Sequence, residues 1–177
     1  MIPYLLKKYG INKNELVVDL GAGQGHCLIP LFEQGWKNLV AVDIDDYNFK
    51  FFEEKYNITC YRVNLEIEKL PIESSKVACI LSFHVIEHLK SPFVYLGEIY
   101  RVLKKGGVVF LVTPDWRKQY KTFWRDPTHY HPYDKESLGR LLRMYGFKKV
   151  EIKSWGTKLG LGKLKSYRWF KWTAFLG

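Results

Sequence analysis

Short apolar runs alternate with segments of helical periodicity along the first two thirds of the sequence. In the intervening segments, apolar residues recur every three or four positions, as on one face of a helix. Strands that are apolar throughout are typical of a parallel sheet that helices cover on both faces. The pattern therefore predicts an α/β fold whose strands occupy residues 16–18, 39–42, 59–63, 77–81 and 108–112.

Helices are expected between these strands, and glycines mark where several of them end. The sequence predicts helices at residues 3–9, 26–34, 46–56 and 93–103. The last of these leads into residues 104–107, two lysines and two glycines, which are typical of a helix C-terminus. Residues 65–75 show no regular pattern.

The last third of the sequence has a different character. Residues 115–134, after the fifth strand, are rich in aromatic and basic side chains, and two prolines disfavour regular structure there. We expect a long functional loop. A helix at residues 135–144 and a sixth strand at 147–155 follow, whereas residues 156–177 fit neither a clean helix nor a clean strand, and their structure stays open.

The composition is that of a single globular domain. The chain has 177 residues, 47% of them hydrophobic and 26% charged, which is enough for one sizeable core. It shows neither an apolar run of membrane-spanning length nor a secretory signal pattern, so we expect a cytoplasmic protein, with peripheral membrane attachment as the alternative. Cys27, Cys60 and Cys79 are widely spaced and are expected to be buried thiols.

The net charge of +10 is unevenly distributed. Residues 1–115 carry 13 basic and 14 acidic side chains, whereas residues 116–177 carry 15 basic and 4 acidic ones. A basic region interleaved with aromatic residues suits an anionic partner such as nucleic acid, a membrane surface or a phosphorylated glycan. The alternative is a solvated face that only maintains solubility.

A glycine-rich turn follows the first strand. The stretch LVVDLGAGQG places Asp19 at the end of the strand and glycines at positions 21, 23 and 25, so that a ligand can approach the backbone closely. A dinucleotide-binding turn requires glycine where His26 stands. A phosphate-binding loop requires Lys followed by Ser or Thr, which this turn lacks. Both of these nucleotide sites are therefore disfavoured.

An acidic residue followed by G-x-G-x-G resembles the signature of the class I S-adenosylmethionine-dependent methyltransferases. The resemblance continues at Asp43, which ends the second strand, in SFHVIEHL after the fourth strand, and in RVLKKGGVVFLVTP before and along the fifth. It implies a Rossmann-like, doubly wound α/β fold with a mainly parallel sheet of six to seven strands and helices on both faces. It also implies a methyltransferase domain at residues 1–155, followed by a basic aromatic tail at 156–177 that belongs to this domain or forms an interaction segment.

The same resemblance implies S-adenosylmethionine as the cofactor and assigns its contacts. In the family, the position of Asp43 hydrogen-bonds both ribose hydroxyls, Asn64 lies near the adenine, and Leu65 packs beside the ring. The implied cofactor-binding residues are Asp19, Gly21, Ala22, Gly23, Gly25, Asp43, Ile44, Asn64, Leu65, Ser82, Phe83 and His84.

Methyl transfer is an in-line displacement at carbon, so the enzyme mainly has to align donor and acceptor. A hydroxyl acceptor also benefits from a base within hydrogen-bonding reach. The candidates for this role are His84 beside the cofactor, and Asp126 and His129 in the segment DPTHYHP, which also contains His131. This segment and LGRLLRMYGF resemble a subgroup of small methyltransferases associated with surface polysaccharide synthesis. Alternatively, His129 and Tyr133 only pack the loop onto the sheet.

Two histidines four residues apart, His84 and His88, can share a helical face, but the sequence shows no third ligand, and we predict no metal site. The predicted function is methyl transfer from S-adenosylmethionine to a small-molecule or glycan acceptor, at oxygen. One alternative is an RNA or other nucleic-acid methyltransferase that uses the basic tail, although SFHV stands where a base-methylating N-P-P-Y tetrapeptide is expected. A further alternative is a non-catalytic binding module.

Overall fold

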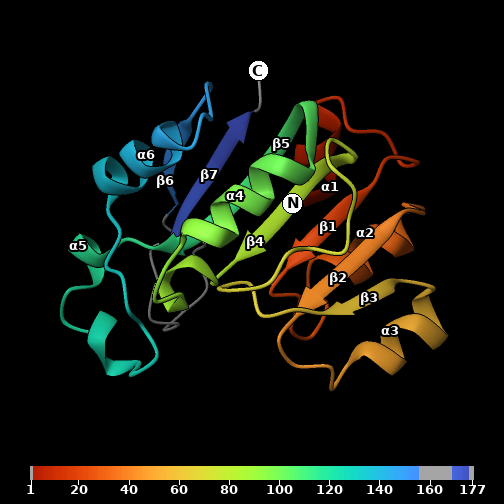
Figure 1. Ribbon diagram of the computed structural model, residues 1–177, viewed down its shortest axis with the longest axis horizontal. Helices are drawn as coiled ribbons and strands as arrows, with labels where there is room; N and C mark the ends of the chain where they lie inside the picture. The colour runs from red at the N-terminus through yellow and green to blue at the C-terminus, as the bar shows by residue number, and fades with distance from the viewer. Residues whose placement is uncertain (1, 156–168, 176–177) are drawn as a thin grey trace, which may run out of the picture.

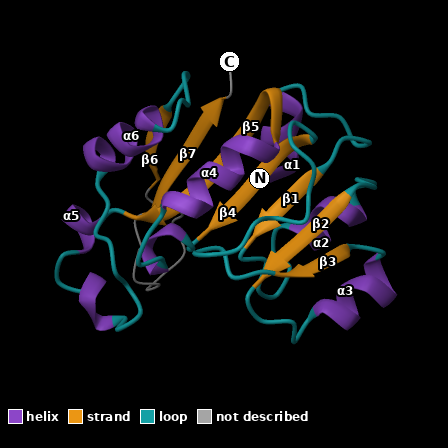
Figure 2. Cartoon of the chain, viewed as in Figure 1, coloured by secondary structure: helices purple, strands orange, loops and turns teal. Residues whose placement is uncertain are grey.

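The computed structural model describes residues 2–155 and 169–175, with side chains described for residues 2–153. Its strands form one seven-stranded sheet in the order β3-β2-β1-β4-β5-β7-β6 (Figures 1 and 2). The strands are β1 (Val17–Leu20), β2 (Leu39–Asp43), β3 (Thr59–Arg62), β4 (Val77–Phe83), β5 (Leu103–Pro114), β6 (Glu151–Trp155) and β7 (Trp169–Phe175). The helices are α1 (Ile2–Lys8), α2 (Leu28–Glu33), α3 (Phe49–Tyr56), α4 (Phe93–Val102), α5 (Trp116–Gln119) and α6 (Lys135–Met144), with short 3-10 turns η1 (Ile86–His88) and η2 (Phe123–Arg125).

Strands β1 to β5 pair in parallel, and β7 pairs antiparallel with both β5 and β6. The predicted doubly wound, mainly parallel sheet is therefore confirmed. The carboxyl ends of β1, β2, β3, β4 and β5 lie along one edge of this sheet, which is where ligands bind in folds of this type.

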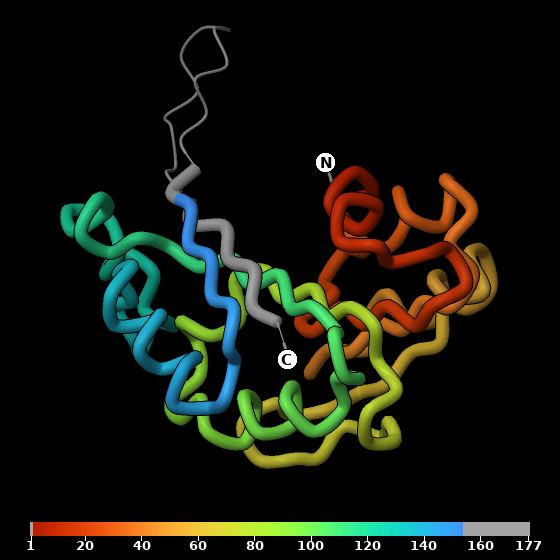
Figure 3. The backbone as a smooth tube through the Cα atoms, turned by 90° about the horizontal axis from the view of Figure 1, so that it is seen from above, coloured from red at the N-terminus to blue at the C-terminus, as the bar shows by residue number. Residues whose placement is uncertain are grey.

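Each face of the sheet is covered by its own hydrophobic core. Along β1, Val17 packs on one face and Val18 on the other, because successive side chains of a strand point to opposite sides. Helices α1, α2 and α3 cover the Val17 face, and α4 and α6 cover the Val18 face (Figure 3). Burial on both faces explains the apolar character of β2 and β4, whereas β3 at the edge of the sheet is partly exposed.

The passage from α4 into β5 differs from the expectation. The helix was expected to run to residue 103 and end in a glycine turn, but it ends at Val102, and β5 begins directly at Leu103, which pairs with Val77. The register of the two strands shifts between Val77 and Cys79. A Cβ at Gly107 would lie 2.8 Å from the Lys104 carbonyl oxygen, so glycine is needed at this irregularity rather than at a helix end.

The C-terminal part of the sheet was only partly predicted. Strand β6 is shorter than the expected 147–155, and residues 169–175, whose structure the sequence left open, form β7 between β5 and β6. These seven residues thus belong to the domain itself. The expected role of the basic tail as an interaction segment also falls on residues 156–168 and 176–177, which lie outside the described residues.

Residues 115–134, expected as a loop, contain the short helices α5 and η2 and connect β5 to α6 at the edge of the sheet that carries the strand carboxyl ends (Figure 1). Within the described part of the chain, no helix combines the length and apolar character needed to cross a bilayer.

Candidate active site

The turn between β1 and α2 is held by its own backbone. The amides of Gly21 and Ala22 both donate to the Val42 carbonyl oxygen, at 2.8 and 3.1 Å, which ties the turn to the end of β2. Gly21 has a φ of +76°, and a Cβ on it would lie only 2.3 Å from Cγ2 of Val85. Glycine is thus required at position 21 both by backbone conformation and by space.

Asp19 lies at the end of β1 and is almost fully buried. Burial raises the pKa of its carboxyl well above the ordinary value, and the nearby charge of Asp43 raises it further, while a hydrogen bond with Cys27 acts in the opposite direction. Its Oδ1 atom has no hydrogen-bond partner among the described residues. A cationic ligand beside the turn would compensate such an unpaired buried carboxyl oxygen.

Asp43 ends β2 beside the glycine turn. Its Oδ2 accepts a hydrogen bond from the Gly23 amide at 2.8 Å, and its Oδ1 accepts one from the Asp45 amide at 3.1 Å. The side-chain amide of Asn48 in turn donates to the Gly23 carbonyl oxygen at 3.0 Å. The carboxylate is therefore fixed by the backbone and stays partly open to solvent, where its remaining lone pairs can accept hydroxyl donors.

A cavity of about 340 Å³, the turn cavity, lies between the glycine turn and the ends of β2, β3 and β4. Of the predicted cofactor residues, it is lined by Gly21, Asp43, Ile44, Asn64, Leu65 and His84. The sequence reasoning missed the rest of the lining, which consists of Val63, Glu66, Val85, His88 and Leu89. Val63, Glu66 and Val85 each adjoin a predicted position, so widening each segment by one residue would have found all three.

The lining of the turn cavity fits S-adenosylmethionine. Apolar Val63, Leu65 and Leu89 offer a surface for a flat ring. The Asp43 carboxylate offers acceptors for sugar hydroxyls, and Gly21 has no side chain that would occupy the cavity. The unpaired oxygen of Asp19, two residues before Gly21, suits the positive charge of the cofactor. Gly23, Gly25 and Ala22 shape the turn without lining the cavity.

Ser82 and Phe83, two further expected cofactor contacts, also lie outside the lining of this cavity. The hydroxyl of Ser82 is buried, donates to the Leu20 carbonyl oxygen at 3.3 Å and accepts from the Tyr95 hydroxyl at 2.7 Å. Phe83 packs against the hydrophobic core on the Val17 face of the sheet. Both residues therefore support the sheet at the end of β4, because their side chains are directed into the packing on either face.

His84 follows β4 in a conformation that is uncommon for a residue with a side chain, with a φ of +61°. Its amide donates to the Val112 carbonyl oxygen at 2.9 Å, and its Nδ1 lies 3.1 Å from Oε1 of Glu87. Because a carboxylate only accepts, Nδ1 carries the proton in this hydrogen bond. The lone pair of the neutral ring is then on Nε2.

Glu87 is a further residue of the candidate site that the sequence reasoning missed. Its side chain is fully buried, and its Oε2 accepts a hydrogen bond from the Thr113 hydroxyl at 2.9 Å. Its carbonyl oxygen accepts from the amides of Tyr130 and His131, at 2.8 and 3.2 Å. Glu87 therefore joins η1, the end of β5 and the segment after η2. The only signal in the sequence is one acid between the two histidines of HVIEHL.

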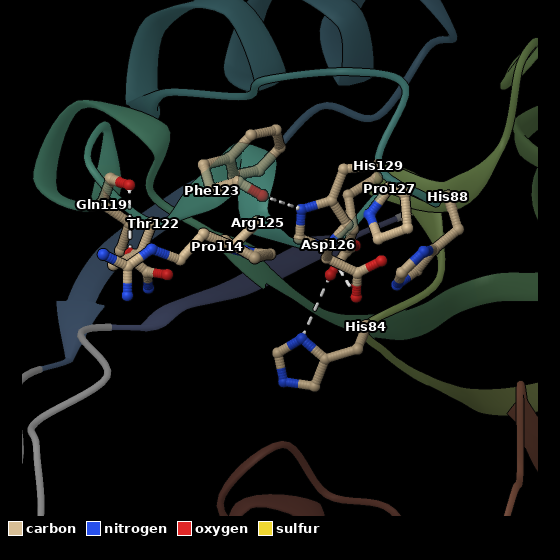
Figure 4. Close-up of a pocket in the computed structure, with 11 residues that line it drawn as sticks. His84, His88, Pro114, Gln119, Thr122, Phe123, Arg125, Asp126, Pro127 and His129 are labelled. Atoms are coloured by element: carbon tan, nitrogen blue, oxygen red, sulfur yellow. Dashed lines mark hydrogen bonds and ion pairs between the residues drawn. The ribbon is translucent and has the colours of Figure 1, made fainter.

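A second cavity of about 570 Å³, the loop cavity, lies beside His84 under residues 114–129. Figure 4 shows His88, Asp126 and His129 together at one end of it and Gln119 and Thr122 at the other. His84 and His88 line both the loop cavity and the turn cavity, so the two spaces meet at these residues. The volume of the loop cavity is in the usual range for a small-molecule site, roughly 300–1,000 Å³.

The structure brings the three catalytic candidates to the loop cavity in different settings. Asp126 is exposed, and its Oδ1 accepts hydrogen bonds from the hydroxyl and the amide of Thr128, at 2.6 and 2.9 Å. These bonds lower the pKa of Asp126 below its ordinary value, which weakens it as a base. His129 is mostly buried, and its Nδ1 lies 2.8 Å from the Phe123 carbonyl oxygen.

Two other residues of the loop have anchoring contacts. Nε2 of His131 lies 2.9 Å from the Lys90 carbonyl oxygen, and His131 does not line the loop cavity. Tyr133 is buried in the hydrophobic core on the Val18 face, and burial raises the pKa of its hydroxyl. Packing of the loop onto the sheet, one of the two readings of this segment, thus holds for Tyr133.

Comparison with solved structures shows the same fold elsewhere. A structure described as an S-adenosylmethionine-dependent methyltransferase from Archaeoglobus fulgidus superposes with a TM-score of 0.74, covering 98% of this chain and 92% of that chain at 20% sequence identity. The sheet order and this superposition show the Rossmann-like fold of the class I S-adenosylmethionine-dependent methyltransferases, which the sequence resemblance implied.

The family follows from the sequence itself. A family model described as "Methyltransferase domain" matches residues 2–152, and the chain therefore belongs to that family. A spinach (Spinacia oleracea) 2-methyl-6-phytyl-1,4-hydroquinone methyltransferase is 29% identical over 83% of this chain. A malonyl-[acyl-carrier protein] O-methyltransferase from Marinomonas is 30% identical over 62% of it. The chain spans 43% and 42% of the lengths of these relatives.

Proposed function

We propose that this protein transfers a methyl group from S-adenosylmethionine to an oxygen atom of a small-molecule or glycan acceptor. The observation that carries the proposal is the position of His84. It lines both cavities, and its Nδ1 is hydrogen-bonded to the buried carboxylate of Glu87. A base is thus held where an acceptor in the loop cavity meets a cofactor in the turn cavity.

The chemistry assigned to His84 is removal of a hydroxyl proton. Glu87 orients the ring, and Nε2 of His84 takes the proton of the acceptor hydroxyl as its oxygen attacks. S-adenosylmethionine supplies the electrophilic methyl group. The new O–CH₃ bond forms as the C–S bond breaks, and the bonding pair remains on sulfur, so that S-adenosylhomocysteine, the methylated acceptor and protonated His84 are produced. Asp43 binds the cofactor, and the walls of both cavities keep donor and acceptor aligned.

The name of the Marinomonas relative, an O-methyltransferase, supports oxygen as the acceptor atom. A second candidate acceptor is RNA, which the 15 basic against 4 acidic side chains of residues 116–177 favour. The two candidate acceptors predict methylation of different components of a cell extract, either small molecules and glycans or RNA.

The test is incubation of the protein with methyl-labelled S-adenosylmethionine and fractionated cell extract. We expect label in a small-molecule or glycan fraction, in a form that nuclease treatment does not release. Label in RNA would contradict the proposed acceptor, and absence of transfer to every fraction would contradict the proposed reaction. Mild alkali then distinguishes a methyl ester, which releases methanol, from a methyl ether, which does not.

Two variants connect this activity to the site. His84→Ala is expected to lower kcat by a factor of about 10² to 10⁴, the usual contribution of a general base, with a much smaller change in the dissociation constant of S-adenosylmethionine. His131→Gln is the matched control, since His131 lies in the same segment but outside the loop cavity. If His84→Ala retains the wild-type kcat, His84 is not the base.

A further inference from the structure

Three potential metal ligands meet at one end of the loop cavity. Glu87 and His88 belong to η1, and His129 lies about forty residues further along the chain. One carboxylate oxygen and one nitrogen from each imidazole all lie within 4.8 Å of one another, and the two imidazole centroids are 4.8 Å apart. Figure 4 shows the two histidines side by side at the cavity. The third ligand that the sequence lacked is thus supplied by the fold.

The protonation of the His129 ring follows from its neighbour. Nδ1 of His129 lies 2.8 Å from the Phe123 carbonyl oxygen, which can only accept a hydrogen bond. Nδ1 therefore carries the proton, and the lone pair of the neutral ring is on Nε2. Metal-binding histidines commonly donate a hydrogen bond from the other ring nitrogen to a backbone carbonyl oxygen, which orients the ring.

The His88 ring is oriented in the same way through Thr128. The Thr128 hydroxyl lies 2.6 Å from Oδ1 of Asp126 and donates its single proton to that carboxylate. Its oxygen must then accept the hydrogen bond from Nδ1 of His88, at 2.8 Å. His88 thus also holds its proton on Nδ1 and its lone pair on Nε2. Both histidines are prepared as Nε2 ligands by partners that use their other nitrogen.

We propose that Glu87, His88 and His129 bind one divalent transition-metal ion, with zinc as the best match. Two imidazoles and one carboxylate form a ligand set that occurs in catalytic zinc sites and leaves coordination positions open. Ligand atoms around a tetrahedral zinc ion are about 3.4 Å apart, given bonds of about 2.0–2.1 Å. Separations of up to 4.8 Å therefore have to shorten by at most about 1.4 Å to complete the site, which a movement of His129 and its segment provides without a change of fold.

The position of the ion points to an acceptor class. This part rests on the proposed function. The ligands line the loop cavity next to His84, so open coordination positions face the space assigned to the acceptor. A tetrahedral zinc ion held by three ligands has one open position, and expansion to five-coordination provides a second. Such an ion favours acceptors that present two oxygen atoms together, such as the vicinal hydroxyls of a sugar or a 2-hydroxy acid. The ion would orient one of these hydroxyls toward His84 and increase its acidity.

The test is titration of the metal-free, tag-free full chain with Co²⁺, followed by visible absorption and calorimetry, and then displacement by Zn²⁺. We expect one ion per chain, with the d–d absorption of a low-coordinate site. His129→Ala and His88→Ala should each weaken binding by more than about 100-fold, since removal of a ligand costs more than the 10- to 100-fold loss of a supporting contact. His131→Gln, which removes a histidine outside the cluster, should bind Co²⁺ like the wild type.

A second pair of variants tests the support of His88. Thr128→Val removes the hydroxyl that accepts from Nδ1 and should weaken Co²⁺ binding about 10-fold, whereas Thr128→Ser should restore it. Absence of saturable binding, or binding that His129→Ala leaves unchanged, would overturn the metal site, provided that circular dichroism shows the variant to be folded. Because the titration contains neither cofactor nor acceptor, it reports on the metal site even if no methyl transfer is found.

Discussion

The turn cavity and the loop cavity meet at His84 and His88, but they are built in different ways. The turn cavity depends on the backbone: the Gly21 and Ala22 amides bind the Val42 carbonyl oxygen, and Asp43 is held by two further amides. The loop cavity depends on side chains from distant segments, which meet at the buried carboxylate of Glu87. The proposed donor site is therefore built mainly by backbone atoms, whereas the proposed acceptor site is built by side chains.

The largest effect is expected where backbone geometry is disturbed. Gly21→Ala places a Cβ against Val85 in a left-handed conformation. The conformation costs roughly 1–2 kcal/mol and the overpacking about 1–3 kcal/mol, so we expect destabilisation by about 3 kcal/mol. The affinity for S-adenosylmethionine should fall by at least about 10-fold, corresponding to about 1.4 kcal/mol. Thermal unfolding and calorimetry measure the two effects.

Gly97→Ala is the matched control for this substitution. Gly97 lies inside α4, and a Cβ there would meet no atom within 4 Å. Alanine in a helix interior is favoured over glycine by about 0.5–1 kcal/mol, so this variant should be slightly more stable than the wild type. If Gly21→Ala binds S-adenosylmethionine with wild-type affinity, the turn cavity tolerates a displaced backbone. The turn cavity would then not depend on backbone geometry, as proposed above.

A smaller effect is expected from the side-chain network of the loop cavity. Thr113→Val keeps the shape of the side chain but removes the donor to Oε2 of Glu87. A buried carboxylate oxygen left without its donor costs about 1–3 kcal/mol. We expect faster hydrogen exchange at the amides of Tyr130 and His131, which bind the Glu87 carbonyl oxygen, and an unchanged affinity for S-adenosylmethionine.

Thr59→Val serves as the control for Thr113→Val, because Thr59 is exposed at the start of β3, far along the chain from this network. It should leave the exchange of both amides unchanged. If Thr113→Val instead weakens cofactor binding as much as Gly21→Ala does, the two cavities are not independently built.

The smallest effect concerns the segment that carries Leu65 and Glu66 to the turn cavity. Arg101 donates to the carbonyl oxygens of Leu70 and Ile72 and to both carboxylate oxygens of Glu98. The hydrogen bond with Arg101 is the main reason that the pKa of Glu98 is below its ordinary value. The unfolded chain therefore binds a proton at Glu98 more readily than the folded chain. The free energy of unfolding decreases as the pH is lowered below about 4.3, the ordinary pKa of a glutamate.

Glu98→Gln should remove this part of the acid sensitivity. At neutral pH the variant loses about 1 kcal/mol of unfolding free energy, while its stability declines less steeply between pH 5 and about pH 3. Urea unfolding across this range measures the slope. Glu54→Gln, which alters an exposed pair with Lys50, should leave the slope unchanged. If the free energy of unfolding depends on acid pH in the same way in Glu98→Gln and in the wild type, Glu98 does not stabilise this segment.

The sequence predicted what depends on local pattern. The strands at 39–42 and 77–81 were found within two residues, because buried parallel strands are apolar on both faces. Gly21 follows β1 directly and Asp43 is the last residue of β2, and both line the turn cavity. Their roles toward the cofactor remain predictions that binding measurements will decide.

What could not be predicted depends on partners that are distant in the sequence. Ser82 follows the same local pattern as His84, yet its hydroxyl is taken by Tyr95 of α4. Glu87 is a single acid between two histidines in the sequence, and its bond with Thr113 forms only when β5 lies beside this segment. The structure of the residues that form β7 was left open because they lack clean alternation, and only the neighbouring strands β5 and β6 explain the place of β7.

The insertion of β7 between β5 and β6 also has a consequence for synthesis. Strands β1 to β5 can pair as they leave the ribosome, but β7 begins 55 residues after β5 ends, and β6 has no other neighbour in the sheet. At about 5–20 residues per second, the edge of β5 stays open for roughly 3–11 seconds. During this interval the unpaired edge of β5 is available for pairing with other chains. Chaperone binding at this stage would therefore protect the nascent protein from aggregation.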